Sequence, residues 1–198
     1  MKTQIWAHRG ASAYAPENTL EAFRLAAEMG ADGVELDVQL SRDGELVVAH
    51  DETIDRVSNG TGYIKDYTLA QLKELSFNRL FPAFKDARIP TLLEVYELLK
   101  PAGLTVNVEL KTGIILYPEI EEKVLALTAS MGMEDRVIYS SFCHPSLVRL
   151  KELDSGLKTG LLYSDGWIDA AAYGRHTVGA DALHPALYHM QDPDLIPA

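Results

Sequence analysis

Apolar and polar positions along the chain follow two alternating periods. In residues 33–40 every second position is apolar, which predicts a β-strand with one buried face. In residues 18–30 the apolar positions recur at helical spacing, which predicts a helix with Asn18 as its N-cap, Glu21 three residues later and Gly30 as its stop. Strand-like and helix-like segments continue to alternate along the chain. This alternation is typical of an α/β fold with a mainly parallel sheet.

The same patterns predict six parallel strands with helices between them. The strands are expected at residues 5–8, 33–40, 105–110, 136–141, 158–163 and 182–184. Besides the first helix, helices are expected after the N-cap Thr68, from the N-cap Thr91 to about Lys100, and at residues 118–131, 145–153 and 167–174.

One connection departs from the alternation. Residues 46–49 form another apolar strand immediately after a turn at residues 41–44. So short a connection cannot cross over to a parallel strand, and the two strands must pair antiparallel. The return strand brings His50 back beside the start of the outgoing strand. The hairpin and the polar loop after it, about residues 39–90, are expected as an insertion in a single domain of residues 1–198.

Composition narrows the choice of partners. The 198 residues include 18 Lys and Arg against 29 Asp and Glu, a net charge of −11. This balance argues against a protein that binds nucleic acid or anionic lipid through bulk charge, and an anionic substrate must therefore meet local positive charge. Cys143 is the single cysteine, so an intrachain disulfide is excluded. The sequence has no signal-like start and no membrane-length apolar run, so we expect a cytoplasmic protein without a membrane span.

Carboxylates mark the ends of two predicted strands. Glu35 and Asp37 share one face of their strand, where two buried acids repel each other unless a hard divalent cation lies between them. The alternative is a solvated face of an edge strand. Glu109 and Lys111 share a face in the same way, and a structural ion pair is the alternative for them. Active sites of α/β folds lie at these strand ends, so the three carboxylates together predict a Mg²⁺ or Ca²⁺ site.

Two histidines and an arginine stand at the ends of predicted strands. His8 and His50 are candidates for acid–base catalysis, because a histidine side chain ordinarily titrates near neutrality, although a single histidine is more often structural. Arg9 offers a planar fork that suits phosphate, and Gly10 allows the chain to turn there.

The order and spacing of these motifs resemble the glycerophosphodiester phosphodiesterase family. The resemblance rests on His8-Arg9-Gly10, Pro16-Glu17-Asn18-Thr19, Glu35-Leu36-Asp37-Val38, Asp43-Gly44, Val48-Ala49-His50-Asp51, Pro90-Thr91-Leu92, Glu109-Leu110-Lys111, Ser140-Ser141-Phe142 and Leu183-His184-Pro185. It implies a (β/α)₈ (TIM) barrel and hydrolysis of glycerophosphodiesters, such as glycerophosphocholine or glycerophosphoethanolamine, to glycerol 3-phosphate and an alcohol. The roles that the resemblance implies are binding of one divalent cation by Glu35, Asp37 and Glu109, acid–base catalysis by His8 and His50, and phosphate binding by Arg9 and Lys111.

Several alternatives remain open at this point. The nucleophile is either water or the substrate's own glycerol 2-hydroxyl. The reaction is either this hydrolysis or that of a related phospholipase D or lyase, and a metal- and phosphate-binding relic without turnover is a third reading.

The sequence departs from the family after the strand at residues 182–184. Members normally add two further strands, with a Trp-Thr-Val-Asn-like and a Gly-Ile-Ile-Thr-Asp-like motif, and neither is present. We therefore expect a barrel that lacks its last two strands, either because the sequence is a fragment or because a partner completes it.

Overall fold

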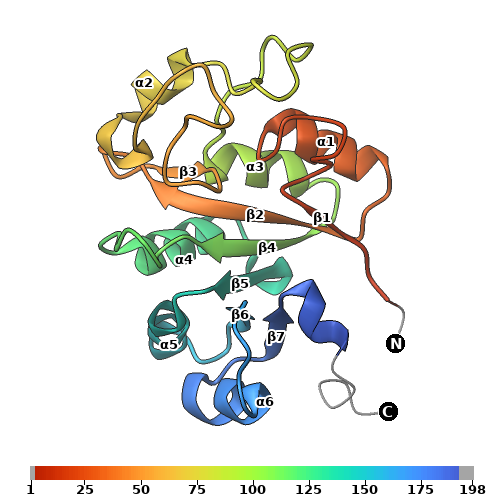
Figure 1. Ribbon diagram of the computed structural model, residues 1–198, viewed down its shortest axis with the longest axis vertical. Helices are drawn as coiled ribbons and strands as arrows, with labels where there is room; N and C mark the ends of the chain where they lie inside the picture. Colours follow the sequence, from red (N-terminus) through yellow and green to blue (C-terminus); the bar gives the residue numbers. More distant parts are fainter. Residues whose placement is uncertain (1–2, 192–198) are drawn as a thin grey trace.

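A curled sheet organises the computed structural model, which describes residues 3–191 (Figure 1). The strands are β1 Trp6–His8, β2 Gly33–Leu40, β3 Leu46–Val48, β4 Thr105–Leu110, β5 Val137–Ser141, β6 Lys158–Tyr163 and β7 Ala182–Pro185. The α-helices are α1 Leu20–Glu28, α2 Leu69–Glu74, α3 Leu92–Leu99, α4 Ile120–Ser130, α5 His144–Leu153 and α6 Ala170–Ala172. Short 3₁₀-helices are η1 Ile64–Asp66, η2 Glu134–Arg136 and η4 Leu187–Gln191.

The six parallel strands run in the order β1-β2-β4-β5-β6-β7. This confirms the predicted parallel strands within the described residues. β3 pairs antiparallel with β2, with Val38 opposite Val48, so the chain does return along β2 as the short connection predicts. β1 and β7 are the two edges of this sheet.

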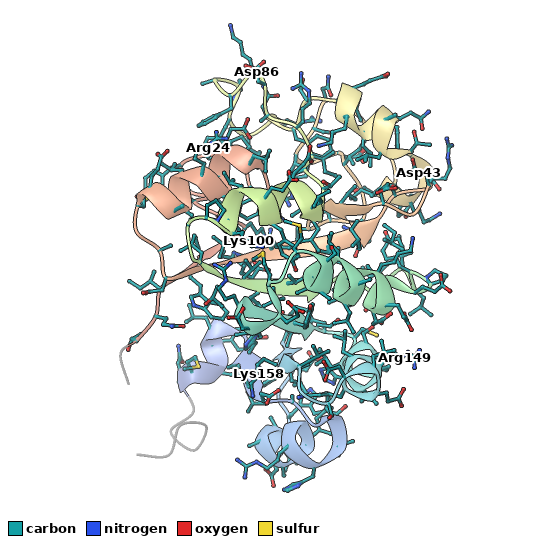
Figure 2. All side chains as sticks on the ribbon, turned by 180° about the vertical axis from the view of Figure 1, so that it is seen from behind. Arg24, Asp43, Asp86, Lys100, Arg149 and Lys158 are labelled. Carbon is teal, nitrogen blue, oxygen red and sulfur yellow. The ribbon has the colours of Figure 1, made fainter. Side chains whose placement is uncertain are left out.

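The two faces of the sheet differ in chemistry. The apolar positions of β2, β4 and β5 pack against α1, α3, α4 and α5 in one buried core, as Val34, Phe23 and Tyr96 illustrate. Figure 2, seen from behind, shows α1, α3 and α4 in front of the strands, with side chains filling the space between them. Because side chains alternate along a strand, the polar positions of β2 and β4 all point to the opposite face. That face carries the candidate site.

A second, smaller core supports the long segment after β3. Ile54, Ile64, Leu72, Phe77 and Ile89 are buried together there with Val47 of β3. The predicted N-caps Thr68 and Thr91 are both confirmed, and each forms a capping box, with Gln71 at α2 and Glu94 at α3. The insertion is therefore a packed unit, and it holds its first residues firmly against the sheet.

Three local predictions were wrong. The N-cap of α1 is Thr19, because Asn18 adopts φ +55° and its side chain points into the site. α4 begins at Ile120 instead of at Pro118, because Glu119 before it is left-handed at φ +62°. The helix expected at residues 167–174 is the short α6, which continues as a π-helix over Tyr173–Val178. Within residues 3–191, no helix is both long enough and apolar enough to span a bilayer.

Candidate active site

Three carboxylates meet on the polar face of the central strands. β2 directs Glu35 and Asp37 to this face, and the parallel register places Glu109 of β4 directly beside Asp37. One oxygen from each residue lies within 4.8 Å of the others. Asp37 is fully buried and Glu109 nearly so. Glu35 Oε1 and Asp37 Oδ1 are buried without any hydrogen-bond partner.

The electrostatics of this cluster are unfavourable for the protein alone. Burial raises the pKa of Glu35 well above its ordinary value, and the charges of Asp37 and Glu109 raise it further. Burial and Asp37 likewise raise the pKa of Glu109, although Lys111 opposes the shift. A hard cation with oxygen ligands would relieve both the repulsion and the unsatisfied oxygens. The triad therefore fits a divalent metal ion.

Two basic side chains flank the carboxylates. Arg9 Nε lies 3.5 Å from Asp37 Oδ2, and the Arg9 backbone N–H donates to Glu35 Oε2 at 3.1 Å. Lys111 Nζ donates to Glu109 Oε1 at 3.0 Å and lies 3.9 Å from Asp37 Oδ1. Arg9 Nε is buried and makes no hydrogen bond of its own. Both cations thus stand beside the triad, where an anionic group would be held.

The turn after β1 depends on a glycine. Arg9 has φ +57° and Gly10 has φ +76°. A Cβ at Gly10 would lie 2.7 Å from the backbone carbonyl carbon of Ala22 in α1, so a side chain has no room there. This close approach of the loop to α1 fixes where the Arg9 side chain starts.

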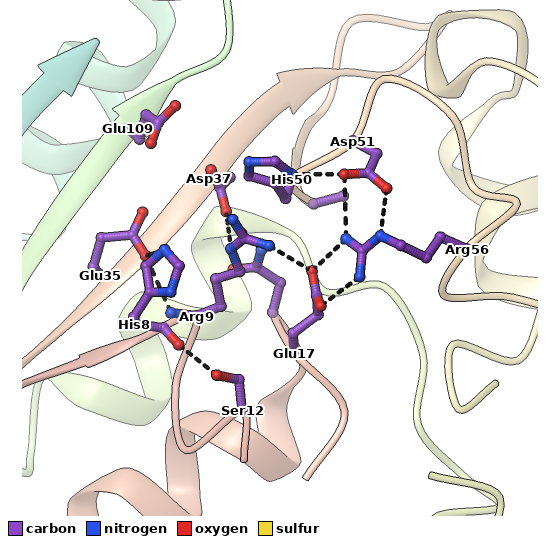
Figure 3. Close-up of polar contacts among 12 residues, drawn as sticks. His8, Arg9, Ser12, Glu17, Glu35, Asp37, His50, Asp51, Arg56 and Glu109 are labelled. Carbon is purple, nitrogen blue, oxygen red and sulfur yellow. Dashed lines mark hydrogen bonds and ion pairs between the residues drawn. The ribbon is translucent and has the colours of Figure 1, made fainter. Parts of the chain in front are cut away.

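The two histidines approach the triad from different sides. His8, at the end of β1, is 67% exposed, and its Nε2 lies 3.8 Å from Glu35 Oε2. Burial and the neighbouring Arg9 lower the pKa of His8. His50 Nδ1 lies 2.6 Å from Asp51 Oδ1. Figure 3 shows the His50 ring between Asp51 and Asp37.

The seven residues predicted from the sequence come together at one place. They are His8, Arg9, Glu35, Asp37, His50, Glu109 and Lys111.

Sequence reasoning missed four further polar residues. Asn18 is buried and its Nδ2 donates to Asp37 Oδ2 at 2.8 Å. Glu17, Asp51 and Arg56 form ion pairs that reach Arg9 and His50. Two signals were available: Glu17, Asn18 and Asp51 stand in motifs that carry the family resemblance, and Thr19 can cap the helix in place of Asn18.

The chain is similar to known phosphodiesterases over nearly its whole length. A family model described as the glycerophosphoryl diester phosphodiesterase family matches residues 8–196. A relative from Caldanaerobacter subterraneus subsp. tengcongensis, named glycerophosphodiester phosphodiesterase, is 48% identical over 197 residues, which are 99% of this chain and 80% of the relative. A protein of the same name from Bacillus altitudinis is 42% identical over 92% of this chain and 75% of its own length.

Solved structures agree with this similarity. A glycerophosphodiester phosphodiesterase from Agrobacterium tumefaciens superposes with a TM-score of 0.84 at 33% identity, covering 97% of this chain and 80% of that one. A phosphodiesterase from Oleispira antarctica, solved in complex with the product sn-glycerol-3-phosphate, superposes with a TM-score of 0.81 at 31% identity, covering 98% and 81%. The curled α/β sheet is therefore of the TIM-like type that this family shares.

Proposed function

This chain belongs to the glycerophosphoryl diester phosphodiesterase family, and from that premise we propose that it hydrolyses glycerophosphodiesters to sn-glycerol 3-phosphate and an alcohol. One observation carries the proposal: a buried carboxylate triad stands beside two cationic side chains and two histidines. The Oleispira antarctica protein, whose structure contains sn-glycerol-3-phosphate, supports the product class.

In this proposal Glu35, Asp37 and Glu109 hold one divalent cation, Mg²⁺ or Ca²⁺. When bound, the ion supplies positive charge that stabilises the phosphoryl oxygens in the transition state. The donor set is all carboxylate, which suits either of these hard ions, and two of the three ligands, Glu35 and Asp37, each have a buried oxygen without a hydrogen bond.

Arg9 and Lys111 bind the phosphoryl oxygens. Each of them contacts the triad from a different strand end, so a phosphate between them meets positive charge on two sides. These two side chains supply the local positive charge that a protein with a net charge of −11 needs in order to bind an anionic substrate.

His8 and His50 divide the proton transfers. One accepts the proton of the attacking hydroxyl and the other donates a proton to the leaving alcohol oxygen, so the two must act in opposite protonation states. Because Asp51 contacts Nδ1 of His50, the nitrogen that exchanges protons in the site is Nε2. We expect a bell-shaped dependence of the rate on pH, and a rate that is monotonic from pH 5 to 9 would contradict the two-histidine mechanism.

The test is release of glycerol 3-phosphate from glycerophosphocholine. We expect turnover with Mg²⁺ or Ca²⁺, its loss in EDTA, and a fall of about 10²–10⁴-fold in His8→Ala. His176→Ala, at an exposed position of the π-helix, is the control and should keep wild-type activity. Binding of the substrate without any product would instead favour a non-catalytic relic.

The same assay separates the remaining alternatives. A cyclic phosphate as the product would identify a related lyase, and release of lysophosphatidic acid when lysophosphatidylcholine is the substrate would identify a related phospholipase D. A substrate without the glycerol 2-hydroxyl distinguishes the nucleophiles, because normal turnover of it excludes attack by that hydroxyl.

A further inference from the structure

Arg56 lies at the centre of a chain of ion pairs beside the candidate site. Its Nη1 and Nη2 donate to the two carboxylate oxygens of Glu17 at 2.7 and 2.8 Å. Its Nε and Nη2 donate to the two carboxylate oxygens of Asp51 at 2.7 and 3.2 Å. One guanidinium thus binds two carboxylates at once, each through two hydrogen bonds, as Figure 3 shows.

Each of these carboxylates also contacts a residue of the proposed mechanism. Glu17 Oε1 accepts a hydrogen bond from Arg9 Nη1 at 3.1 Å. Asp51 Oδ1 lies 2.6 Å from Nδ1 of His50. The contacts therefore run without a break from the phosphate-binding Arg9, through Arg56, to the acid–base residue His50.

The two carboxylates in this chain of ion pairs come from separate parts of the fold. Glu17 lies in the loop between β1 and α1, whereas Asp51 follows β3, and β1 and β3 do not pair with each other in the sheet. Gln39 of β2 holds the backbone at residues 49–51 from one side, since its Nε2 donates to the carbonyl oxygens of all three residues at 2.7–3.2 Å. Arg56 joins this segment to the loop after β1, 39 residues from Glu17 in the sequence.

We propose that Arg56 is a positioning residue, which holds the Arg9 guanidinium and the His50 imidazole in one fixed arrangement through Glu17 and Asp51. This inference rests on the proposed function, because it assigns Arg56 to the same reaction. Within residues 3–191 Arg56 forms its ion pairs with Glu17 and Asp51 and not with the carboxylate triad, so it acts through these two carboxylates.

The arrangement also determines the tautomer of His50. An ionised carboxylate can only accept, so Asp51 places the proton of a neutral imidazole on Nδ1 and leaves the Nε2 lone pair free for the site. Arg56 keeps the Asp51 carboxylate ionised and stops it from rotating. A lysine could not replace this fork, since one ammonium lacks the planar geometry that binds two carboxylates bidentately.

If Arg56 had only a structural role, its removal would reduce the stability of the protein as much as its activity. The Arg56 side chain is 41% exposed, and ion pairs with that much solvent contribute little to stability. The loop around Arg56 already has its own buried core of Ile54, Ile64 and Phe77. We therefore expect removal of Arg56 to reduce activity far more than stability.

The first test is kinetic and compares two variants of Arg56 with a matched control. In Arg56→Met we expect kcat for glycerophosphocholine to fall about 10–100-fold, as for other residues that orient a site residue, with KM changed less than kcat. Arg56→Lys keeps the charge and should recover only a small part of the loss. Arg149→Met removes a comparable surface pair, the one between Arg149 of α5 (Figure 2) and Glu122 of α4, and should keep wild-type kcat.

The second test does not depend on turnover. Imidazole ¹⁵N shifts of the protein, with the His50 signal identified by its absence in His50→Gln, report which ring nitrogen carries the proton. In the wild type we expect His50 protonated at Nδ1 when neutral, and in Arg56→Met we expect a mixture of both tautomers. Thermal unfolding of each variant shows that it is folded.

The outcomes are distinguishable from failure of the function itself. A wild-type protein without turnover would overturn the proposed function, while the tautomer measurement would still judge the role of Arg56. An active wild type with Arg56→Met at full kcat and an unchanged His50 tautomer would overturn the positioning role. A fall in kcat matched by loss of folded protein, with Nδ1 still protonated, would overturn it as well.

Discussion

Asp37 shows how a buried charge is made tolerable in this molecule. It is fully buried, yet Asn18 donates to its Oδ2, and Arg9 and Lys111 approach it from two sides. Its Oδ1 keeps no hydrogen bond. A carboxylate with neighbours on most sides and one free oxygen is suited to a ligand that arrives later, and a fully satisfied structural aspartate would show no such gap.

Asp51 allows a test of the ion-pair chain through pH. Burial alone would raise the pKa of Asp51, but hydrogen bonds from Arg56 and His50 outweigh it and lower the pKa from 3.8 to about 2. A carboxyl group with a lowered folded pKa stabilises the protein above its unfolded pKa, and this contribution is lost as the pH falls toward the folded value. We expect Asp51→Asn to be less stable than wild type at pH 5.

The difference in unfolding free energy between wild type and Asp51→Asn should shrink when the pH is lowered from 5 to 3. Urea unfolding at both values measures it. Asp86→Asn, in an exposed loop (Figure 2), serves as the control. A difference that stays constant or grows toward pH 3 would contradict the role given to the Asp51 charge.

At the scale of elements, the loop between β1 and α1 does most to place the site. Residues 9–18 contain two non-glycine residues with positive φ, Arg9 and Asn18, and both side chains reach Asp37. Left-handed backbone costs about 1 kcal/mol or more for such residues, and the surrounding contacts must supply that energy. Two of the four non-glycine residues with positive φ in the described part of the chain thus lie at the candidate site, and the other two, Glu119 and Asp169, precede α4 and α6.

Substitution of two glycines that share a left-handed backbone conformation distinguishes backbone strain from steric crowding. Gly10→Ala should destabilise the protein by about 2–4 kcal/mol, because it combines a left-handed residue with a Cβ pressed against α1. Gly30→Ala, at φ +79° with no atom within 4 Å of its Cβ, should cost only about 1 kcal/mol. Chemical denaturation of both variants gives the comparison, and equal losses would show that the close approach at Gly10 is unimportant.

Sequence periodicity predicted the sheet well, because strand alternation is set by burial of one face. β2, β4 and β6 begin and end where the patterns place them. Helix starts were less predictable, since Asn18 and Thr19 are both good N-caps. Thr19 takes this position because the Asn18 side chain donates a hydrogen bond to Asp37 instead. The π-helix has no sequence signal of its own.

The candidate site was predictable where it lies on paired strands and not where it spans loops. Parallel register brings Asp37 and Glu109 together automatically, so their proximity follows from the strand assignment. The ion pair of Glu17 with Arg56 joins two loops, and no periodicity relates their conformations. Whether the barrel requires two further strands stays a prediction.

At the scale of the whole molecule, the carboxylate triad joins β2 and β4, the two strands that pair over the greatest length in the sheet. Glu35 and Asp37 come from β2 and Glu109 from β4. Without a cation the three carboxylates oppose this pairing, and with one they reinforce it. Metal binding should therefore change the stability of the entire fold, because these strands separate only when the protein unfolds.

We expect Mg²⁺ or Ca²⁺ at about 100 times its Kd to stabilise the protein by about 2.7 kcal/mol. At this chain length, that free energy corresponds to a rise in Tm of roughly 5–10 °C over the EDTA-treated protein. Differential scanning calorimetry with and without the ion measures the rise. No shift with either ion would argue against a metal site at the triad.

The effect of Glu35→Gln on stability should differ between the metal-free protein and the protein with metal. In EDTA the variant should be at least as stable as wild type, because it removes one repelling buried charge and keeps the shape of the side chain. With metal present it should lose the rise in Tm. Glu45→Gln, at an exposed position, should behave as wild type in both conditions. A full metal-induced rise in Glu35→Gln would exclude Glu35 as a ligand.

The position of the seven candidate residues along the chain has a further consequence. All of them lie between residues 8 and 111, while β5, β6 and β7 come afterwards. Because these strands are parallel to β1, β2 and β4, their carboxyl ends point in the same direction. We therefore expect the loops after these later strands to border the site without supplying its charged groups. Substitutions in these loops should leave the carboxylate triad and its flanking cations in place.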